Sequence, residues 1–213
     1  TATPIPRTLS MSVYANMDVS VIDELPPGRK PIQTSCLPLS GKEKLIERIA
    51  AAIKKGSKVY WICPLIEESE NLDLNAVMET HEDLSEHFGQ DKVGCLHGKL
   101  SAIKKQEQVQ AFKDSKTSIL VSTTVVEVGV DIPDADIMVI ENAERFGLAQ
   151  LHQLRGRIGR GIKESFCILL HKDKIQDVSS QRLQVLVDSQ DGFKIAEEDL
   201  VIRGPGEIMG AQQ

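Results

Sequence analysis

Residues 118–170 contain three short apolar runs, SILVST at 118–123, DIMVIE at 136–141 and SFCILL at 165–170. Each run has the length and the apolar content of a buried strand. An apolar helical pattern from about residue 148 to 157 separates the last two runs. Strands that alternate with helices in this way pair in parallel, because each helix carries the chain back to the start of the next strand.

The same alternation extends through the rest of the chain. Further strands are expected at Val19–Asp23, Gln33–Leu39, Lys58–Cys63 and Lys92–Leu96. Further helices are expected from the capping box Ser40-Gly-Lys-Glu43 to Gly56, over Asn71–Phe88, and from Ser101 to about Asp114. Beyond Lys172 the strands stop, and the pattern predicts two helices at Ile175–Ser189 and Phe193–Val201. The sequence therefore predicts an α/β fold, a parallel sheet with helices on both faces followed by a C-terminal helical hairpin.

The composition is that of an ordinary globular protein. The chain has 213 residues, of which 41% are hydrophobic and 26% are charged, and its formal net charge is −6. This acidic balance argues against binding nucleic acid through bulk positive charge, although it leaves room for a local basic surface. No apolar run approaches the roughly 18 to 20 residues of a membrane helix, and no signal peptide is recognisable. We therefore expect a cytoplasmic protein with no membrane partner.

The cysteines and histidines predict no metal site within the chain. Cys63, Cys95 and Cys167 lie in apolar strand-like runs, and no two cysteines form a CxxC pair. Buried reduced thiols are expected in place of disulfides or zinc ligands. His97 and His152 stand singly without metal-ligand spacing, so structural hydrogen bonding is the expected role for a histidine of this kind.

Three arginines and two glycines lie within eight residues in Gln153-Leu-Arg-Gly-Arg-Ile-Gly-Arg160. On a helix, Arg157 and Arg160 would share one face because they are three positions apart. The glycines remove side chains that would keep a large anion away. Two guanidinium groups close together suit a triphosphate, which they can bind through paired hydrogen bonds. Taken alone, the segment can also be a solvated basic helix end.

Three polar loops follow predicted strands. His97-Gly-Lys99 follows one strand, Thr123–Pro133 follows a second, and Glu141–Arg145 follows a third. Ligand sites in parallel sheets lie beyond the carboxyl ends of the strands. We expect these loops to meet at one edge of the sheet together with the arginine segment, forming one polar surface.

The sequence lacks one half of a phosphoryl-transfer site. A phosphate-binding loop needs the pattern G-x-x-x-x-G-K-[ST], and neither Gly41-Lys42 nor Gly98-Lys99 fits it. No Asp-Glu pair ends an apolar strand to hold magnesium. The arginine segment would therefore complete a site whose phosphate loop lies elsewhere.

Three segments, in order along the chain, resemble motifs of superfamily 2 helicases. Thr1-Ala-Thr-Pro-Ile-Pro resembles motif III, Thr123–Asp131 resembles motif V, and Gln153–Arg160 fits the motif VI pattern QxxGRxGR. The runs DELPPGR at 23–29, WICPLIEES at 61–69 and ENAERFGLAQLHQ at 141–153 are similar to the bacterial RecG family of branched-DNA helicases. The tail over residues 182–207 resembles the TRG motif, which this family shares with transcription-repair coupling factors.

The resemblance implies three parts of the chain. Residues 1–24 would be the motif III segment and an interdomain linker, residues 25–172 a RecA-like helicase C-terminal motor domain, and residues 173–213 the TRG helical hairpin and its loop. The chain opens without Met at Thr1 and looks like a fragment of a longer polypeptide.

The implied activity is that of the C-terminal motor half of an ATP-dependent helicase. Its partners would be branched DNA, such as forks and Holliday junctions, and a first RecA-like motor domain of the same polypeptide. That domain would supply most of the contacts to ATP and Mg²⁺, so this chain alone is expected to be inactive. The whole protein would work as a monomer in fork regression, recombination and repair.

The resemblance also implies residue roles around ATP. Arg157 and Arg160 would be arginine fingers that reach the ATP bound on the first motor domain, and Gln153 would couple them to motif III. Gly129 and Asp131 would line the nucleotide side of motif V. Asp131 can instead simply cap a turn before Ile-Pro.

A second group of residues would contact DNA or couple the ATP cleft to DNA: Thr1, Thr3, His97, Thr123, Thr124, Arg182, Arg203 and Gln213. Within it, Arg182 and Arg203 match the arginines that tie the hairpin to motif VI. Gln213 matches a glutamine in a loop that acts on duplex DNA. Relatives commonly carry a basic residue just before that glutamine, where this chain has Gln212, and this departure weakens the case for a phosphate contact there.

Two alternative functions remain at the level of sequence. One is the corresponding domain of a transcription-repair coupling factor, which would act on RNA polymerase; the ELPPGR run favours the RecG family. The other is a catalytically silent nucleic-acid-binding α/β module, against which the paired Arg157 and Arg160 argue.

Overall fold

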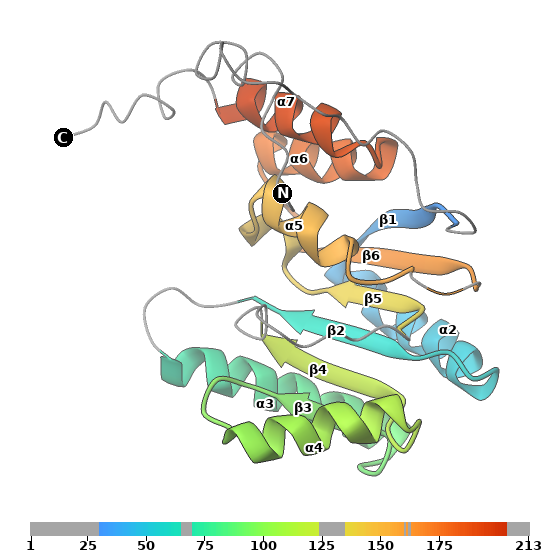
Figure 1. Cartoon of the computed structure of the whole chain (residues 1–213). Coiled ribbons are helices and arrows are strands. Elements are labelled where there is room, and N and C mark those ends of the chain that lie inside the picture. The colour runs from blue at the N-terminus through green and yellow to red at the C-terminus, as the bar shows by residue number, and fades with distance from the viewer. Residues whose placement is uncertain (1–29, 65–69, 124–134, 160, 162, 204–213) are drawn as a thin grey trace, which may run out of the picture.

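A computed structural model describes residues 30–64, 70–123, 135–159, 161 and 163–203 of the chain. Within them, six strands form one sheet in the order β1-β6-β5-β2-β4-β3. The strands are β1 (Ile32–Pro38), β2 (Val59–Cys63), β3 (Val93–Leu96), β4 (Ile119–Thr123), β5 (Ile137–Ile140) and β6 (Ser165–His171). Every neighbouring pair is parallel, as the alternation of strands and helices predicted (Figure 1).

Three of the four inner strands, β5, β2 and β4, are buried along their whole length. Continuous apolar runs are what a parallel strand needs when helices cover both of its faces. Trp61, at the middle of β2, has no exposed surface and belongs to the core. The six strands lie within one residue of their predicted bounds, and the strand expected at Val19–Asp23 lies outside the described residues.

Helices cover both faces of the sheet, as predicted. On one face lie α2 (Lys42–Lys54) and α3 (Glu70–Phe88), whose buried Leu45, Ile46, Ile49, Val77 and Leu84 share a core with Trp61. On the other face lie α4 (Ala102–Lys113), α5 (Leu148–Arg155), α6 (Asp177–Asp188) and α7 (Gly192–Arg203). Their buried residues form a second core with the opposite face of the same strands.

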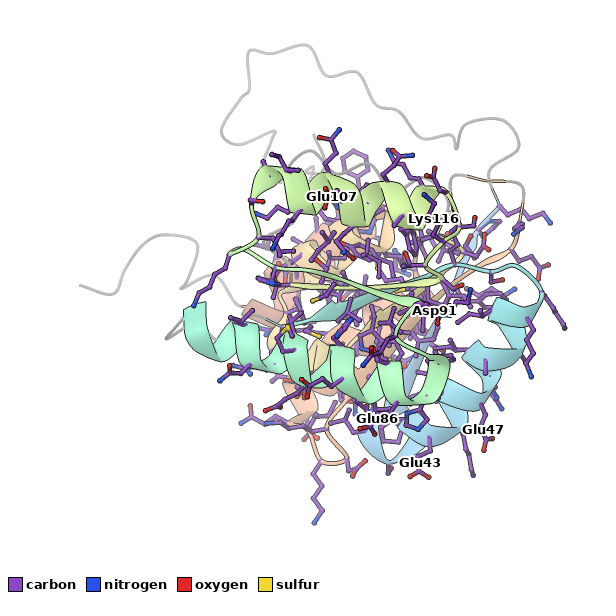
Figure 2. The ribbon with its side chains drawn as sticks, turned by 90° about the horizontal axis from the view of Figure 1, so that it is seen from below. Glu43, Glu47, Glu86, Asp91, Glu107 and Lys116 are labelled. Atoms are coloured by element: carbon purple, nitrogen blue, oxygen red, sulfur yellow. The ribbon has the colours of Figure 1, made fainter. Side chains whose placement is uncertain are left out.

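The solvent side of α3 is acidic, whereas that of α2 carries both acidic and basic residues. Glu43 and Glu47 on α2 and Glu86 on α3 are exposed, and Figure 2 shows them at the outer surface of the two helices. The acidic run over residues 79–86 is thus largely a solvated face. This surface accounts for part of the negative net charge and faces away from the sheet.

Two predicted helix ends differ from the structure. α2 begins after Gly41 with no side-chain cap, so the predicted capping box at Ser40 and Glu43 is wrong. A short 3-10 turn over Leu39–Gly41 moves the helix start past Ser40, whose backbone N–H donates to Asp173 Oδ1 at 3.1 Å. Ser101, in contrast, caps α4 as predicted, because its hydroxyl accepts from the Lys104 N–H at 3.3 Å.

The second difference concerns the arginine segment. α5 ends at Arg155 and not at Arg157, so Arg157 lies in the turn that follows the helix. Gly159, further along this turn, has a φ of 75°, which glycine adopts at little cost. The prediction that Arg157 and Arg160 share one helix face is therefore wrong for Arg157, and Arg160 lies outside the described residues.

α6 and α7 form the predicted helical hairpin, packed against α5 beside β1 (Figure 1). Leu183 and Leu186 of α6 and Ile195 of α7 are buried in the same core as the leucines of α5. The hairpin is thus continuous with the core of the sheet domain. Among the residues that the structure describes, no helix combines the length and the apolar character that crossing a membrane requires.

Candidate functional site

The predicted arginine site starts on α5. Leu148, Leu151 and Leu154 are buried along one face of this helix, while Gln153 is exposed on another. The Arg157 N–H donates to Leu154 O at 3.0 Å, so the backbone keeps turning for one more step after the helix ends. Arg157 itself is partly exposed. These contacts fix the backbone that carries one predicted arginine finger.

The end of the arginine segment does not lie at the predicted edge of the sheet. A Cβ added at Gly159 would lie 3.0 Å from Ile32 Cγ1 and 3.6 Å from Ser165 Cβ. Ile32 and Ser165 are the first residues of β1 and β6. The prediction that this segment joins the three loops at the carboxyl edge is therefore wrong at Gly159. The reason is that a helix between parallel strands runs from the carboxyl end of one to the amino end of the next.

Arg155 is the functional candidate that sequence reasoning missed. Its side chain is buried, with an exposed fraction of 3%. Nη1 donates to Leu186 O at 2.6 Å and to Ser189 O at 2.9 Å, at the carboxyl end of α6, and lies 3.3 Å from Thr34 Oγ1. One guanidinium group therefore joins α5, the hairpin and β1.

Burial lowers the pKa of Arg155, but an arginine stays protonated at any physiological pH. The positive charge lies at the carboxyl end of α6, where the helix dipole favours a cation. A signal for this role was present in the sequence. Arg155 falls on the apolar face of α5, four positions after Leu151, and an arginine on an apolar face predicts a buried contact.

His152 lies beside this guanidinium group. Its Nδ1 is 3.2 Å from Arg155 Nη2. The pKa of His152 is lowered by burial and by the charge of Arg155, while Asp191 opposes the shift. The ring is therefore neutral at physiological pH, and Nδ1 can accept the hydrogen bond from Arg155.

At the carboxyl edge of the sheet, two predicted site residues each have a buried polar atom with no hydrogen-bond partner among the described residues. They are the hydroxyl of Thr123, at the end of β4, and Nδ1 of His97, which follows β3. Burial, Lys105 and Lys99 lower the pKa of His97, so its ring is neutral at physiological pH. Buried polar atoms are nearly always bonded in proteins, so such atoms can mark places where a partner completes the site.

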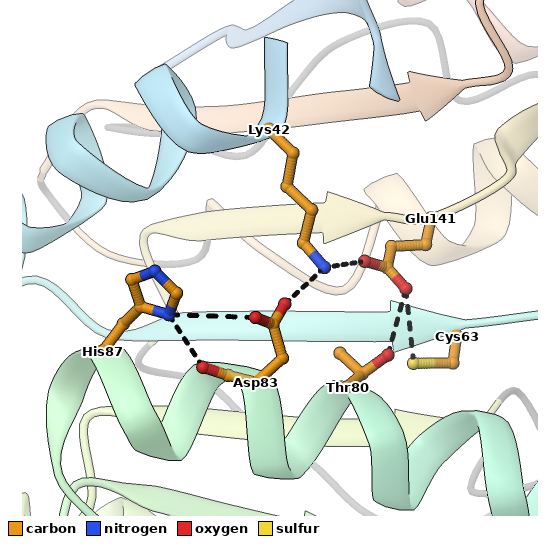
Figure 3. A network of polar contacts seen from close by, with 6 residues as sticks. All are labelled: Lys42, Cys63, Thr80, Asp83, His87 and Glu141. Carbon is orange, nitrogen blue, oxygen red and sulfur yellow. Dashed lines mark hydrogen bonds and ion pairs between the residues drawn. The ribbon is translucent and has the colours of Figure 1, made fainter. Parts of the chain in front are cut away.

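A polar network ties α2 and α3 to the same carboxyl edge (Figure 3). Lys42 Nζ lies 2.8 Å from Asp83 Oδ2 and 3.1 Å from Glu141 Oε1. Thr80 Oγ1 donates to Glu141 Oε2 at 3.2 Å, and Cys63 Sγ lies 3.9 Å from the same oxygen. Glu141, directly after β5, is thus held by two helices and a strand.

The charges in this network reinforce each other. Burial lowers the pKa of Lys42, but Glu141 and the hydrogen bond to Asp83 raise it by more, so the net shift is upward. Burial, followed by the negative charge of Glu141, raises the pKa of Cys63 well above its usual range. Cys63 is therefore an inert thiol, as expected for a buried reduced cysteine.

The remaining three cysteines are also free thiols. Burial raises the pKa of Cys36 and of Cys95 to about 11, and that of Cys167 to about 12. Thiols with such values carry almost no thiolate at neutral pH. Cys63 and Cys167 are buried, as predicted, whereas Cys95 is only partly buried.

Two further residues near the hairpin have buried polar atoms with no hydrogen-bond partner within the described ranges. Both carboxylate oxygens of Glu144, in the 3-10 turn Ala143–Arg145 after β5, are buried and accept no hydrogen bond from the described residues. Nε of Arg182, on α6, is also buried without one. The turn and α6 are in contact. Arg182 therefore lies on the hairpin helix that packs against the segment after β5.

Several predicted site residues lie outside the described residues: Thr1, Thr3, Thr124, Gly129, Asp131, Arg160 and Gln213. Arg203 is the last residue of α7, and only its backbone is described. The roles expected for these residues stay predictions. Of the predicted residues that are described, the structure places His97 and Thr123 at the carboxyl edge, Arg157 in the turn after α5, and Arg182 on the hairpin.

Residues 41–161 match the family described as the helicase conserved C-terminal domain. The ATP-dependent DNA helicases RecG of Pasteurella multocida and of Escherichia coli strain K12 are each 52% identical to the chain over its whole length. The chain spans 31% of the length of each of these relatives. RecG of Aquifex aeolicus is 53% identical over the whole chain, which spans 27% of that relative.

A comparison with solved structures also finds similarity to RecG. A structure of RecG bound to a three-way DNA junction superposes with a TM-score of 0.78 and 45% identity, covering 97% of this chain and 27% of the other. The Mycobacterium smegmatis helicase Lhr, bound to single-stranded DNA and AMP-PNP, superposes with a TM-score of 0.57 at 20% identity, covering 86% of this chain and 25% of the other. The second likeness shows a shared RecA-like fold alone. Because the family match covers more than half of the sequence and the likeness to RecG runs through all of it, the chain belongs to the family of helicase conserved C-terminal domains.

Proposed function

We propose that this chain is the second motor half of an ATP-dependent helicase that acts on branched DNA. In the whole protein, a first motor domain holds ATP with Mg²⁺, and the arginine segment of this chain completes the site. The proposal includes action on forks and Holliday junctions, a role in recombination and repair, a monomeric state and a cytoplasmic location. It rests on similarity to proteins named ATP-dependent DNA helicase RecG and to a RecG bound to a three-way junction.

The observation that carries the proposal is the link between α5 and the hairpin. Arg155 of α5 donates to two carbonyls at the end of α6, and Arg157 lies two residues further along the same segment. A movement of Arg157 toward or away from a phosphate therefore acts on a backbone that is fastened to the hairpin. A helicase needs such a connection between its ATP site and the part that moves DNA.

We carry the roles around ATP over from the resemblance to superfamily 2 helicase motifs. Arg157 and Arg160 stabilise the charge that develops on the transferred phosphoryl group, and Gln153 couples them to motif III in residues 1–24. An arginine supplied by a second domain raises the rate of phosphoryl transfer by roughly a thousand-fold or more. Gly129 and Asp131 line the nucleotide side of the cleft.

The roles toward DNA form a second set. We assign DNA contact or coupling to Thr1, Thr3, His97, Thr123, Thr124, Arg182, Arg203 and Gln213. The buried hydroxyl of Thr123 and the buried Nδ1 of His97 support this assignment, because neither has a hydrogen-bond partner in the part of the chain that the structure describes. The motor domain of residues 25–172 then drives a hairpin and loop in residues 173–213.

The proposal is tested in the whole protein, with its first motor domain present. Arg157→Ala should lower DNA-stimulated ATP hydrolysis by about a hundred- to ten-thousand-fold, whereas ATP affinity should change much less. The measurement is phosphate release at saturating ATP, together with equilibrium binding of an ATP analogue. Arg48→Ala is the matched control, because Arg48 is an exposed arginine on α2, on the opposite face of the sheet.

Two results would contradict the proposal. Normal hydrolysis in the Arg157 variant would remove that arginine from the ATP site. Equal losses in binding and in turnover would indicate a uniform binding role and no arginine finger. The isolated chain adds a further check, because it should release no more phosphate than buffer does.

A further inference from the structure

The loop between α6 and α7 holds the first residue of the edge strand β1. The Ile32 N–H donates to Gln190 Oε1 at 3.2 Å, and Gln190 Nε2 donates to Ile32 O at 3.0 Å. β1 is the last strand on its side of the described sheet. The carboxamide of Gln190 therefore occupies the place that a neighbouring strand's peptide group would take, and it binds both polar groups of one residue.

The loop that carries Gln190 is itself firmly built. Ser189 ends α6 with a backbone N–H that donates to Val185 O, and its hydroxyl accepts from the Asp191 N–H at 3.2 Å. Asp191 Oδ1 then accepts from the Phe193 N–H at 2.9 Å, within the first turn of α7. Local bonds of this kind fix the backbone on both sides of Gln190, so its side chain is aimed at Ile32.

Ile32 is also in contact with the arginine segment. A Cβ at Gly159 would lie 3.0 Å from Ile32 Cγ1 and 3.3 Å from Ile32 Cδ1, so the backbone of Gly159 lies directly against this side chain. Gly159 is two residues after Arg157. Ile32 thus lies between the turn that follows the arginine and the loop of the hairpin.

A second route joins the same parts. Arg155 binds Leu186 O and Ser189 O next to the loop, and it lies within hydrogen-bond distance of Thr34, two residues beyond Ile32. The entering strand, the arginine helix and the hairpin loop therefore meet in one region of the domain. Arg155 acts at the end of α6, whereas Gln190 acts on the strand through which the preceding residues enter the sheet.

We propose that Gln190 is a positioning residue that couples the entering strand β1 and the arginine turn to the hairpin. The inference rests on the proposed function and adds a second connection to the one through Arg155. When the arginine turn shifts with the state of the nucleotide, Gly159 presses on Ile32, and the paired bonds to Gln190 carry the shift to the hairpin loop. Loss of those bonds leaves the ATP site intact and weakens the movement of DNA that each hydrolysis event drives.

The test uses the whole protein and a three-way DNA junction. Gln190→Ala should leave DNA-stimulated ATP hydrolysis within about twofold of wild type, while junctions unwound per ATP hydrolysed fall about three- to tenfold, within the range for loss of a coupling contact. Gln190→Glu keeps an acceptor for the Ile32 N–H but has no donor for Ile32 O, so a smaller loss is expected. Gln184→Ala is the matched control, because Gln184 bonds to Asp188 within α6 and should give the wild-type ratio.

The number of junctions unwound per ATP separates coupling from a merely structural role. A structural role predicts a lower melting temperature with equal losses of hydrolysis and unwinding, and that result would overturn the proposal. A wild-type ratio in the Gln190 variant would also overturn it.

A second measurement decides the inference independently of DNA unwinding. A non-hydrolysable ATP analogue should change the amide hydrogen exchange of residues 189–195 in the wild-type protein, and Gln190→Ala should abolish that change. Absence of the change in wild type overturns the inference. A wild-type protein that shows the change but unwinds no junction overturns the proposed function and leaves the coupling standing.

Discussion

Two polar networks bury positive charge in this chain, and they do so in opposite ways. Lys42 is paired with two carboxylates, Asp83 and Glu141, and this network joins α2, α3 and the end of β5. Arg155 instead binds two backbone carbonyls at the end of α6 and lies against the ring of a histidine, His152.

The difference teaches what each network is suited to do. Ion pairs such as those of Lys42 neutralise charge inside one rigid unit and depend on the identity of each partner. A guanidinium group that binds carbonyls grips the backbone itself, whatever side chains the helix carries. The first network holds the sheet domain together, whereas the second fastens a separate element to that domain.

The largest effect is expected when Arg155, which fastens the hairpin to the sheet domain, is replaced. Arg155→Met should lower the free energy of unfolding by about 3 kcal/mol, because Leu186 O and Ser189 O stay buried and lose their donor. Arg155→Lys should lose less, since one ammonium group keeps the charge but cannot reach every acceptor. Denaturant unfolding of the chain measures both effects.

The exposed Arg48 supplies the control for this prediction. Arg48→Met should change the free energy of unfolding by less than about 0.5 kcal/mol, as expected for a surface site. If the Arg155 and Arg48 variants are equally stable, the carbonyls at the end of α6 find other partners, and the hairpin is not fastened by this residue.

Most of the fold could be predicted from the sequence, and the site could be predicted only in part. Strands β2, β4 and β5 are continuous apolar runs, so their burial follows from composition, and their parallel pairing follows from the helices that alternate with the strands. The arginine segment was recognisable as a motif, but its glycines were interpreted as room for an anion. The structure adds a positional reason, because Gly159 lies against Ile32 with no space for a side chain.

The contacts that could not be predicted are those between distant positions. Gln190 and Ile32 are 158 positions apart, and nothing in either local sequence indicates that they meet. Lys42 and Glu141 become neighbours only because β1 and β5 end at the same edge of the sheet. Periodicity identifies elements, whereas contacts between their ends depend on the order of strands, which the sequence pattern leaves open.

The Lys42 network gives a smaller expected effect. Lys42→Met should lower the free energy of unfolding by about 1 to 2 kcal/mol, because Glu141 loses a charged partner at a site where its side chain is only 10% exposed. The double variant Lys42→Met with Glu141→Gln should recover part of this loss, since it removes the buried carboxylate that Lys42 neutralises, while the more exposed Asp83 stays solvated. Thermal or denaturant unfolding of the two single variants and the double variant gives the coupling energy.

This double-mutant cycle also tests how the two networks differ. Additive losses would mean that Lys42 and Glu141 act independently and that solvent screens the pair. A recovery in the double variant would confirm that the pair acts as one unit inside the domain. No equivalent single substitution can rescue Arg155→Met, because the acceptors of Arg155 are backbone atoms.

The smallest expected effect is a dependence of stability on pH at the Arg155 network. The pKa of His152 is lowered in the folded chain by burial and by the charge of Arg155. Between this lowered value and the ordinary histidine value of about 6.5, the unfolded chain binds more protons than the folded chain, so stability falls as the pH falls. Above about pH 7.5 the histidine is neutral in both states and has no effect.

His152→Gln, which keeps an acceptor for Arg155, should flatten the curve of stability against pH between pH 5 and 7 by less than about 1 kcal/mol. His97 is a second histidine with a lowered pKa, so His97→Gln serves as the comparison and reports the carboxyl edge. Unfolding curves measured at several pH values for the wild type and both variants separate the two contributions. An unchanged slope in His152→Gln would mean that the ring and the guanidinium group do not interact in solution, and that the charge of Arg155 is satisfied by the carbonyls of α6 alone.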